Sequence, residues 1–279
     1  MEKVDYSMVE TVLAKMNEFQ RESVVIEIAP DNTPEILDSK FGGQPYIPRS
    51  VGKAPMTTDG ELLRLLAQFN LSQLPQGVFP AEKGILQFFI DCTDDLYGAD
   101  FDDWTCDTGY KVIFYPEIES AYLSREEITE LYVDYEEEYA PIDDGEWGLV
   151  FTKKVEELSL DDYRFDDLFK EIWNERYPEH TINSAFDLSE EFYSRIYDER
   201  GGMQHKLLGY PGFTQCDPRE YNDEDKQDFE LLFQMDSDFG KDVSYEIMWG
   251  DAGIANFFIK PTDLEKLDFS NVAYNWDCS

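Results

Sequence analysis

The sequence is poor in basic residues. Its 23 lysines and arginines stand against 61 aspartates and glutamates, so the formal net charge is −38 over 279 residues. The longest basic run is the pair Lys153 and Lys154. Nucleic acids and anionic membranes are bound largely through lysine and arginine, so we expect neither as a direct ligand. The charge favours a basic protein partner; the alternative is an acidic surface that serves only solubility.

Cysteine and histidine are also scarce. The four cysteines lie at positions 92, 106, 216 and 278, and the two histidines are His180 and His205. No Cys-x-x-Cys pair is present and no histidine stands at a zinc-ligand spacing, so no metal site is predicted from these residues. We expect unbridged thiols in a reducing cytoplasm, although the spacing leaves a bridge between Cys92 and Cys106 open.

Long apolar runs and catalytic motifs are missing as well. The longest uncharged stretch, residues 65–81, contains glutamines and a proline, so we expect no membrane span. The acidic N-terminus lacks the basic and apolar regions of a secretory signal, which favours a cytoplasmic protein. Phosphate-binding loops, nucleophile elbows and His-Glu-x-x-His are absent. We therefore predict no cofactor and no catalytic residue, and the chain reads more as a non-enzyme than as an enzyme.

What the chain does contain is a duplicated pattern. Residues 40–68 align with residues 206–234 at an offset of 166, with identities at seven of 29 positions. These identities include the lysine, glycine and proline of a Lys-x-x-Gly-x-Pro segment and a Leu-Leu-x-Gln segment. A three-residue shift then aligns residues 84–90 with 253–259, where five of seven residues are identical. Two ordered blocks indicate an internal repeat.

The repeated segments read as paired strands. Strict alternation places Leu65 with Ala67 and Phe69 on one face, and Leu66 with Gln68 on the other. Apolar residues on both faces are typical of central strands that are covered on both sides. Gly43 and Gly209 each stand two residues before a proline, which favours a tight turn that needs a positive φ, or a close backbone approach.

Helices are predicted outside the repeats. Apolar spacing predicts an N-terminal helix over residues 4–19, followed by a strand over 23–30. Ser124 and Glu127 form a capping box that opens a helix toward residue 139, and Thr262 begins a similar box. Further helices are expected over 161–177 and 189–200, with strands over 147–155 and 271–276.

The expected fold is α+β, with two homologous, mostly antiparallel, β-rich halves fused into one body and helices outside and between the copies. The predicted divisions are an N-terminal helix packing on the body (1–22), a first repeat half (23–157), a helical connector (158–202) and a second repeat half (203–279). The 42 aromatic residues (20 Phe, 17 Tyr, 5 Trp) are enough to pack such a body.

The acidic clusters are the main place where other chemistry is possible. Six aspartates fall within fourteen residues without an intervening basic residue: Asp94, Asp95, Asp100, Asp102, Asp103 and Asp107. Hard cations take oxygen ligands from such loops, but the spacing is not that of an EF-hand. A solvated loop is the simpler interpretation, and a metal-assisted hydrolase that uses this loop is the alternative.

Four repeat residues are candidate ligand-binding residues: Gly43, Gln68, Gly209 and Gln234. A buried glutamine must satisfy several hydrogen-bonding positions. Gln68 and Gln234 would therefore either bridge loop backbones or face a ligand in a cleft between the repeats.

These same motifs carry a family resemblance. The Phe-Gly-Gly-Gln-Pro segment at 41–45, the Leu-Leu-Ala-Gln segment at 65–68, residues 84–91 and the Trp-Gly-Asp segment at 249–251 resemble the YwqG family of bacterial proteins. The resemblance implies no established activity and no catalytic residues. It suggests a link to toxin–immunity loci, and a similar pattern occurs in a eukaryotic family implicated in ribosomal-protein chaperoning. Both associations are analogies that favour protein binding.

The leading hypothesis from the sequence is a non-enzymatic binding protein for a basic partner, either toxin-neutralising or chaperone-like. The alternatives are the metal-assisted hydrolase and small-ligand binding between the repeats. The sequence does not determine the oligomeric state.

Overall fold

The computed structural model describes residues 4–133, 139–220, 224–239 and 244–279. Its strands form one antiparallel sheet in the order β10-β9-β8-β7-β1-β6-β2-β3-β4-β5. They are β1 (Arg21–Ala29), β2 (Lys40–Gly42), β3 (Arg64–Asn70), β4 (Ile85–Ile90), β5 (Tyr110–Tyr115), β6 (Glu146–Glu156), β7 (Lys206–Leu208), β8 (Glu230–Asp236), β9 (Ile254–Ile259) and β10 (Ala273–Asp277). An α+β fold with antiparallel pairing is confirmed.

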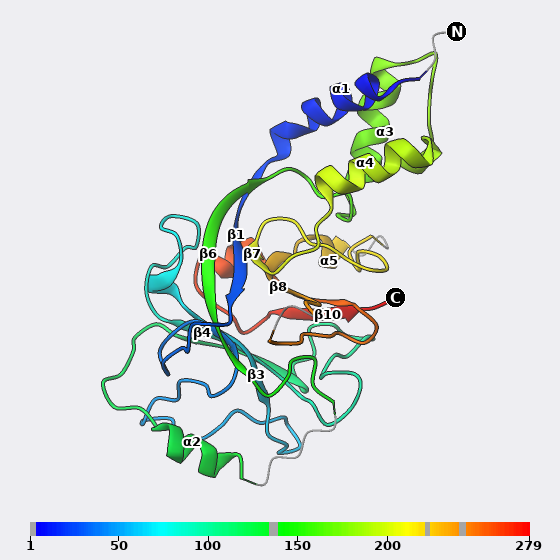
Figure 1. The fold of residues 1–279 in the computed structure, drawn as a ribbon. Coiled ribbons are helices and arrows are strands. Elements are labelled where there is room, and N and C mark those ends of the chain that lie inside the picture. Colours follow the sequence, from blue (N-terminus) through cyan, green and yellow to red (C-terminus); the bar gives the residue numbers. More distant parts are fainter. Residues whose placement is uncertain (1–3, 134–138, 221–223, 240–243) are drawn as a thin grey trace.

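Helices α1, α3 and α4 lie together beyond one side of the sheet, and α2 lies at the opposite side (Figure 1). They are α1 (Tyr6–Met16), α2 (Arg125–Leu131), α3 (Phe165–Arg176), α4 (Glu190–Arg200), α5 (Glu224–Gln227) and α6 (Pro261–Leu264). Helices α1, α3 and α4 form one lobe, in which the predicted apolar stripe of α1 packs on Phe165, Phe169 and Trp173 of α3. No helix within the described residues combines the length and the hydropathy that a membrane crossing requires.

Two helix boundaries differ from those expected. Ser124 and Glu127 form the predicted capping box, but α2 ends at Leu131, and residues 134–138 of the expected helix lie outside the described residues. The capping box expected at Thr262 is wrong, because α6 already begins at Pro261. Proline suits the first helical position, where its missing N–H leaves no bond unmade.

The two ends of the sheet repeat one pattern of pairing. Strands β2 to β5 form one end, which we call the first end, and β7 to β10 form the second end. Lys40 lies opposite Gln68 on the first end, as Lys206 lies opposite Gln234 on the second. Strand β4 pairs with β3 in the register in which β9 pairs with β8. Residues that occupy the same place in the two ends are called equivalent below.

A bulge in each end corrects the predicted faces of the central strands. The register shifts between Leu65 and Ala67 in β3, and between Leu231 and Phe233 in β8. Because a bulge adds one residue to one strand, it reverses the alternation beyond it. Leu66 therefore joins the main core with Ala67, whereas Leu65 lies in a separate cluster on the other face.

The main core lies between the two ends. The rings of Phe69 and Phe233 are 5.1 Å apart between centroids, and those of Phe88 and Phe257 are 4.9 Å apart. All residues of β4 and β9 are buried, as the prediction of strands covered on both faces requires. The sheet thus curls so that its two ends share one hydrophobic interior.

The centre of the sheet crosses the order of the chain. Strand β1 precedes the first end in sequence, yet it pairs with β7 of the second end. Strand β6 precedes the second end, yet it pairs with β2 of the first. Strands β1 and β6 pair with each other along their length, from Arg21 opposite Glu156 to Ala29 opposite Gly148. Each end is therefore completed by the strand that directly precedes the other end in the order of strands along the chain.

Candidate functional site

The repeated lysines form buried ion pairs at opposite ends of β6. Lys40 Nζ lies 2.8 Å from Glu146 Oε1, and Lys206 Nζ lies 3.3 Å from Glu156 Oε2. Both lysine side chains are at most 1% exposed. Burial lowers the pKa of both lysines, and the neighbouring glutamates oppose this shift. A buried charge requires such a partner. Since both lysines are paired within the protein, we interpret them as structural residues of the sheet.

The two predicted glycines make room for these glutamates. Gly43 and Gly209 have φ angles of +71° and +80°, in the left-handed region that favours glycine. A Cβ on Gly43 would come within 2.6 Å of Glu146 Cβ. A Cβ on Gly209 would collide with Glu156 Oε2 and would come within 2.8 Å of Ser23 Cβ. The positive φ and the close approach that the sequence favoured are both confirmed.

The two predicted glutamines bridge loop backbones in the same way. Gln68 accepts a hydrogen bond from the Tyr46 N–H at 2.8 Å and donates to the carbonyls of Ile36 and Asp38. The side chain is fully buried, so these bonds meet the needs of its amide.

Gln234 repeats this arrangement at the equivalent positions. It accepts from the Gly212 N–H at 2.8 Å and donates to the carbonyls of Gly202 and Gln204. The structure thus shows the bridging role for both glutamines, and a direct role in ligand binding stays a prediction. Of the four candidate residues, Gly43 borders the cavity described next.

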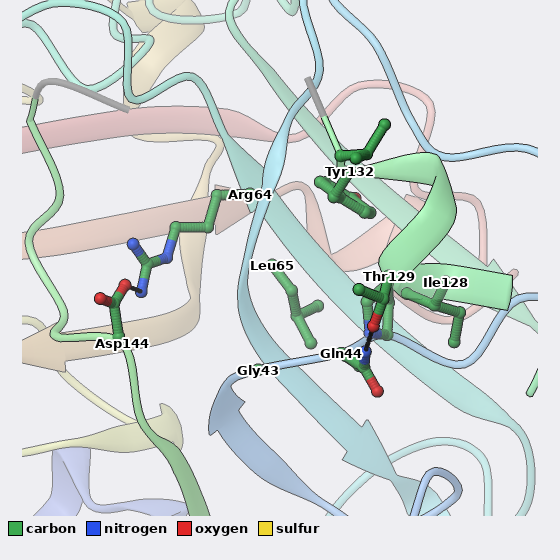
Figure 2. A pocket seen from close by; sticks show the side chains of 10 residues that line it. Gly43, Gln44, Arg64, Leu65, Ile128, Thr129, Tyr132 and Asp144 are labelled. Atoms are coloured by element: carbon green, nitrogen blue, oxygen red, sulfur yellow. Dashed lines mark hydrogen bonds and ion pairs between the residues drawn. The ribbon is translucent and has the colours of Figure 1, made fainter. Parts of the chain in front are cut away.

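A cavity of about 420 Å³ lies beside α2 on the first end, and we call it the Arg64 cavity. Figure 2 shows its walls: α2 with Tyr132 stands on one side, and Arg64 with Asp144 stands on the other. The lining residues are Gly43, Gln44, Pro45, Arg64, Leu65, Ile128, Thr129, Tyr132, Val133 and Asp144. The lining is mixed, with an apolar floor and a charged rim.

Charge and hydrogen bonding fix the walls of this cavity. The Arg64 side chain is 11% exposed; its Nη2 donates to the Asp143 carbonyl at 2.7 Å and lies 3.8 Å from Asp144 Oδ1. Tyr132 donates its hydroxyl hydrogen to the Leu63 carbonyl at 3.0 Å, and burial raises its pKa. Tyr132 is therefore uncharged, and it stands on the side of the cavity opposite the cationic Arg64.

The predicted acidic cluster lies in the 91–109 loop, which we call the acidic loop. Asp94 accepts from the Leu96 N–H and Asp100 from the Asp102 N–H, each at 3.0 Å. Such turns use the carboxylates to hold the loop backbone. Backbone N–H groups lower the pKa of Asp100, so its carboxylate stays charged at neutral pH. Among the described residues, no group of three or more His, Cys, Asp or Glu side chains is placed to hold a metal ion.

The acidic loop encloses a recess of about 430 Å³. Its lining residues include Asp91, Asp94, Leu96, Asp100, Phe101 and Asp102. Leu96 and Phe101 are 45% and 56% exposed, so apolar surface is displayed among carboxylates. The sequence identified the aspartates but not the two apolar residues, because an isolated leucine or phenylalanine in a loop carries no signal of exposure.

Aromatic residues anchor the acidic loop on the second end. The Trp104 ring lies 5.3 Å from the rings of both Phe229 and Phe258. Trp276 Nε1 donates to the Leu96 carbonyl at 2.8 Å, and Tyr97 packs on Trp249 with centroids 5.4 Å apart. In sequence, the loop connects β4 and β5 of the first end, but its aromatic residues pack on the second end. This packing fixes the position of the loop and of its aspartates.

The remaining candidates for catalysis or metal binding are the cysteines and the histidines. No disulfide joins the cysteines in the described part of the chain, so the bridge that the spacing left open is not formed. His205 Nδ1 accepts from the Asp236 N–H at 3.0 Å, and the His180 carbonyl accepts from Trp173. Neither arrangement pairs a histidine with a nucleophile.

The chain was also compared with known proteins. No curated protein matches it. A family model, described as a domain of unknown function (DUF1963), matches residues 39–278. The match begins after β1, so the strand at the centre of the sheet lies outside it. Since the match spans most of the sequence, the chain belongs to the DUF1963 family of proteins with a domain of unknown function.

Proposed function

We propose that this protein is a non-enzymatic binding protein that holds a basic, partly apolar segment of another protein on its acidic loop. The observation that supports this proposal is the recess of about 430 Å³ that displays Leu96 and Phe101 among aspartates. Apolar side chains supply contact area, and the surrounding carboxylates select cationic neighbours.

The local charge supports a cationic occupant. Within the loop, the aspartates bond mainly to backbone N–H groups, which orient the carboxylates without neutralising them. Lys111, just after the loop, pairs with Asp107 at 2.6 Å. The net charge of −38 attracts basic partners over a longer range and speeds their association at low salt.

The proposal extends to the origin of the scaffold. The two ends descend from one duplicated unit, and their leading strands β1 and β6 have exchanged places. The matching registers, bulges and glutamine bridges support this history. The YwqG-like motifs and a cytoplasmic location belong to the same proposal, in which the partner is a toxin or a client protein.

Fluorescence anisotropy with a labelled peptide, KFKKLKFK, tests the binding site. We expect binding at 20 mM NaCl that weakens at least tenfold at 200 mM, because salt screens surface charges. Phe101→Ser and the double variant Asp94→Asn with Asp102→Asn should each weaken binding about fivefold.

Matched controls separate the site from total charge. Phe186→Ser removes another exposed aromatic residue, at 68% exposure, and Glu190→Gln with Glu191→Gln removes two charges from α4. Both controls should bind as the wild type does. Equal losses of binding in the control and loop variants would show that the peptide responds to net charge and not to the acidic loop. Absence of binding at 20 mM NaCl would contradict the proposal. A parallel calcium titration tests the metal-dependent alternative.

A further inference from the structure

The two outermost strands of the sheet differ in how their edges are covered. Strands β5 and β10 hold equivalent places, and each pairs with one neighbouring strand. The edge of β10 is covered by the acidic loop, where the Tyr274 N–H donates to the Trp104 carbonyl at 2.8 Å. Along β5, no backbone hydrogen bond in the described part of the chain joins residues 111–115 to a segment other than β4. The edge of β5 is therefore open to a further strand.

The register of β5 shows which of its backbone groups point away from β4. The Asp91 N–H donates to the Gly109 carbonyl at 2.8 Å, so these two residues form a hydrogen-bonded pair. Such pairs alternate along an antiparallel ladder, which directs the backbone groups of Ile113 toward β4. The N–H and C=O groups of Val112 and Phe114 consequently point outward. They have the spacing that an added strand requires.

A largely apolar groove of about 580 Å³ lies beside the same part of β5. One wall includes β5 from Val112 to Phe114, and the other is formed by residues 266–270, which precede β10. Residues 111–115 are all half-buried, whereas every residue of the neighbouring β4 is buried. The Phe114 ring packs on that of Phe269 with centroids 5.4 Å apart. The groove thus offers apolar surface to the side chains of a strand that pairs with β5.

Charge decides between two kinds of strand that could occupy this edge. A second copy of the chain could pair its own β5 there, but it would bring a further net charge of −38, and two such bodies repel each other. Of the charged side chains that line the groove, Lys266 lies 3.7 Å from Asp263, and Asp268 adds a carboxylate. A basic, partly apolar segment is therefore favoured over a second copy.

We propose that a basic, partly apolar segment of a partner protein adds to the sheet as an extended strand along β5. This inference rests on the proposed function for the chemistry of the partner, and it adds the conformation in which the partner binds. Backbone hydrogen bonds to Val112 and Phe114 hold the segment, and alternate side chains enter the groove.

The groove and the recess of the acidic loop are close enough for one segment to reach both. Gly109 borders the recess, and Val112, three residues later, borders the groove. At about 3.3 Å per residue, these positions are roughly 10 Å apart along the chain. A segment of a few extended residues covers that length.

Hydrogen exchange followed by NMR on the full chain tests the pairing, with the peptide KFKKLKFK as the probe. We expect the amides of Val112 and Phe114 to exchange about tenfold more slowly when the peptide is bound, because they gain hydrogen bonds. The amides of Lys111 and Ile113 already face β4 and are the internal controls, with changes of less than about threefold. Unchanged exchange at Val112 and Phe114 with the peptide bound would overturn the proposal.

A modified peptide gives a second readout. N-methylation of residues 2 to 7 of KFKKLKFK keeps every side chain and charge but removes the backbone N–H groups that strand addition uses. We expect this peptide to bind about tenfold more weakly than the parent in fluorescence anisotropy. Equal affinities of the two peptides would contradict strand addition.

The outcomes for strand addition and for the acidic loop are separable. Weakened binding in Phe101→Ser without protection at β5 would keep the loop as the site and overturn strand addition. Protection at β5 with unchanged binding in Phe101→Ser would support strand addition and contradict the loop site. Protection in the free protein that rises with concentration, together with a dimer in sedimentation, would make a second copy the occupant and overturn the proposal. Absence of peptide binding at 20 mM NaCl would overturn both.

Discussion

The two ends of the sheet keep the same interior and differ in what covers them. Both contain a buried lysine–glutamate pair, a bulged strand and a glutamine that bridges loop backbones. Outside, the second end is closed by Trp104 and by Arg219, which is fully buried between Asp162 and Asp217. The first end carries α2 and the Arg64 cavity instead.

This difference separates two kinds of requirement. The interior groups have no access to water, so each donor and acceptor must find its partner inside the protein. The groups that cover the outer faces can differ as long as the apolar patch beneath them is shielded from water. New binding chemistry is therefore more readily found at the covers than at the repeated residues.

The largest effect is expected from removing the strand that joins the ends. A chain consisting of residues 39–278 lacks β1, which lies between β7 and β6. Both neighbours would expose an unpaired edge, and Val24 and Ile26 would leave the core. We expect no cooperative unfolding transition by circular dichroism. A cooperative transition with the urea dependence of the full chain would show that each end is complete without the exchanged strand.

The next largest effect is expected from replacing each of the two buried lysines. Lys206→Met leaves Glu156, whose side chain is 6% exposed, and should cost about 4 kcal/mol in the free energy of unfolding by urea denaturation. Lys40→Met should cost about half as much, because Glu146 is also bound by Arg125 at 2.8 Å. Replacing Glu156 by leucine in the Lys206→Met variant should recover part of the loss. Equal losses in the two lysine variants would contradict the assigned role of Arg125.

A smaller and symmetrical effect is expected at the glutamines. Gln68→Leu and Gln234→Leu each leave three backbone groups without their partner and should each cost about 3 kcal/mol. Urea denaturation measures both losses, with Gln20→Leu as a surface control expected to change stability by less than about 0.5 kcal/mol. If one glutamine proved dispensable, the two bridges would not be equivalent in energy.

The smallest effect on the free energy of unfolding is expected at Asp236, whose equivalent in the first end is Asn70. Burial raises the pKa of Asp236 to about 6, and the neighbouring His205 opposes that shift. The ordinary value is about 4, so the folded protein binds more protons than the unfolded chain between pH 4 and 6. Stability therefore falls as pH rises through that window.

Asp236→Asn should remove this fall. The free energy of unfolding should rise by about 2 kcal/mol at pH 7 and stay nearly unchanged at pH 4. Urea denaturation at a series of pH values measures the effect, and Asp228→Asn, at 68% side-chain exposure, is the matched control. A gain of the same size at both pH values would point to a cause other than protonation.

Much of the framework, and the aspartates of the acidic loop, were visible in the sequence, but the Arg64 cavity was not. The positive φ of Gly43 and the bridging by Gln68 follow from residue chemistry, and both were anticipated. The bulge at Leu66 was missed, because strict alternation has no means of marking an inserted residue. Arg64 was overlooked because the comparison of the repeats considered identical residues, and Arg64 aligns with a different residue, Glu230.

The sequence by itself determined the local pattern: which segments pair as central strands, where glycine is needed, and that the surface is strongly acidic. These follow from side-chain polarity and backbone freedom within a few residues. Only the tertiary structure decided that β1 lies beside β7, that Trp104 crosses to the second end, and that a cavity forms beside α2. Those outcomes depend on contacts between residues far apart in the chain, and their geometry is set by how the whole sheet curls and packs.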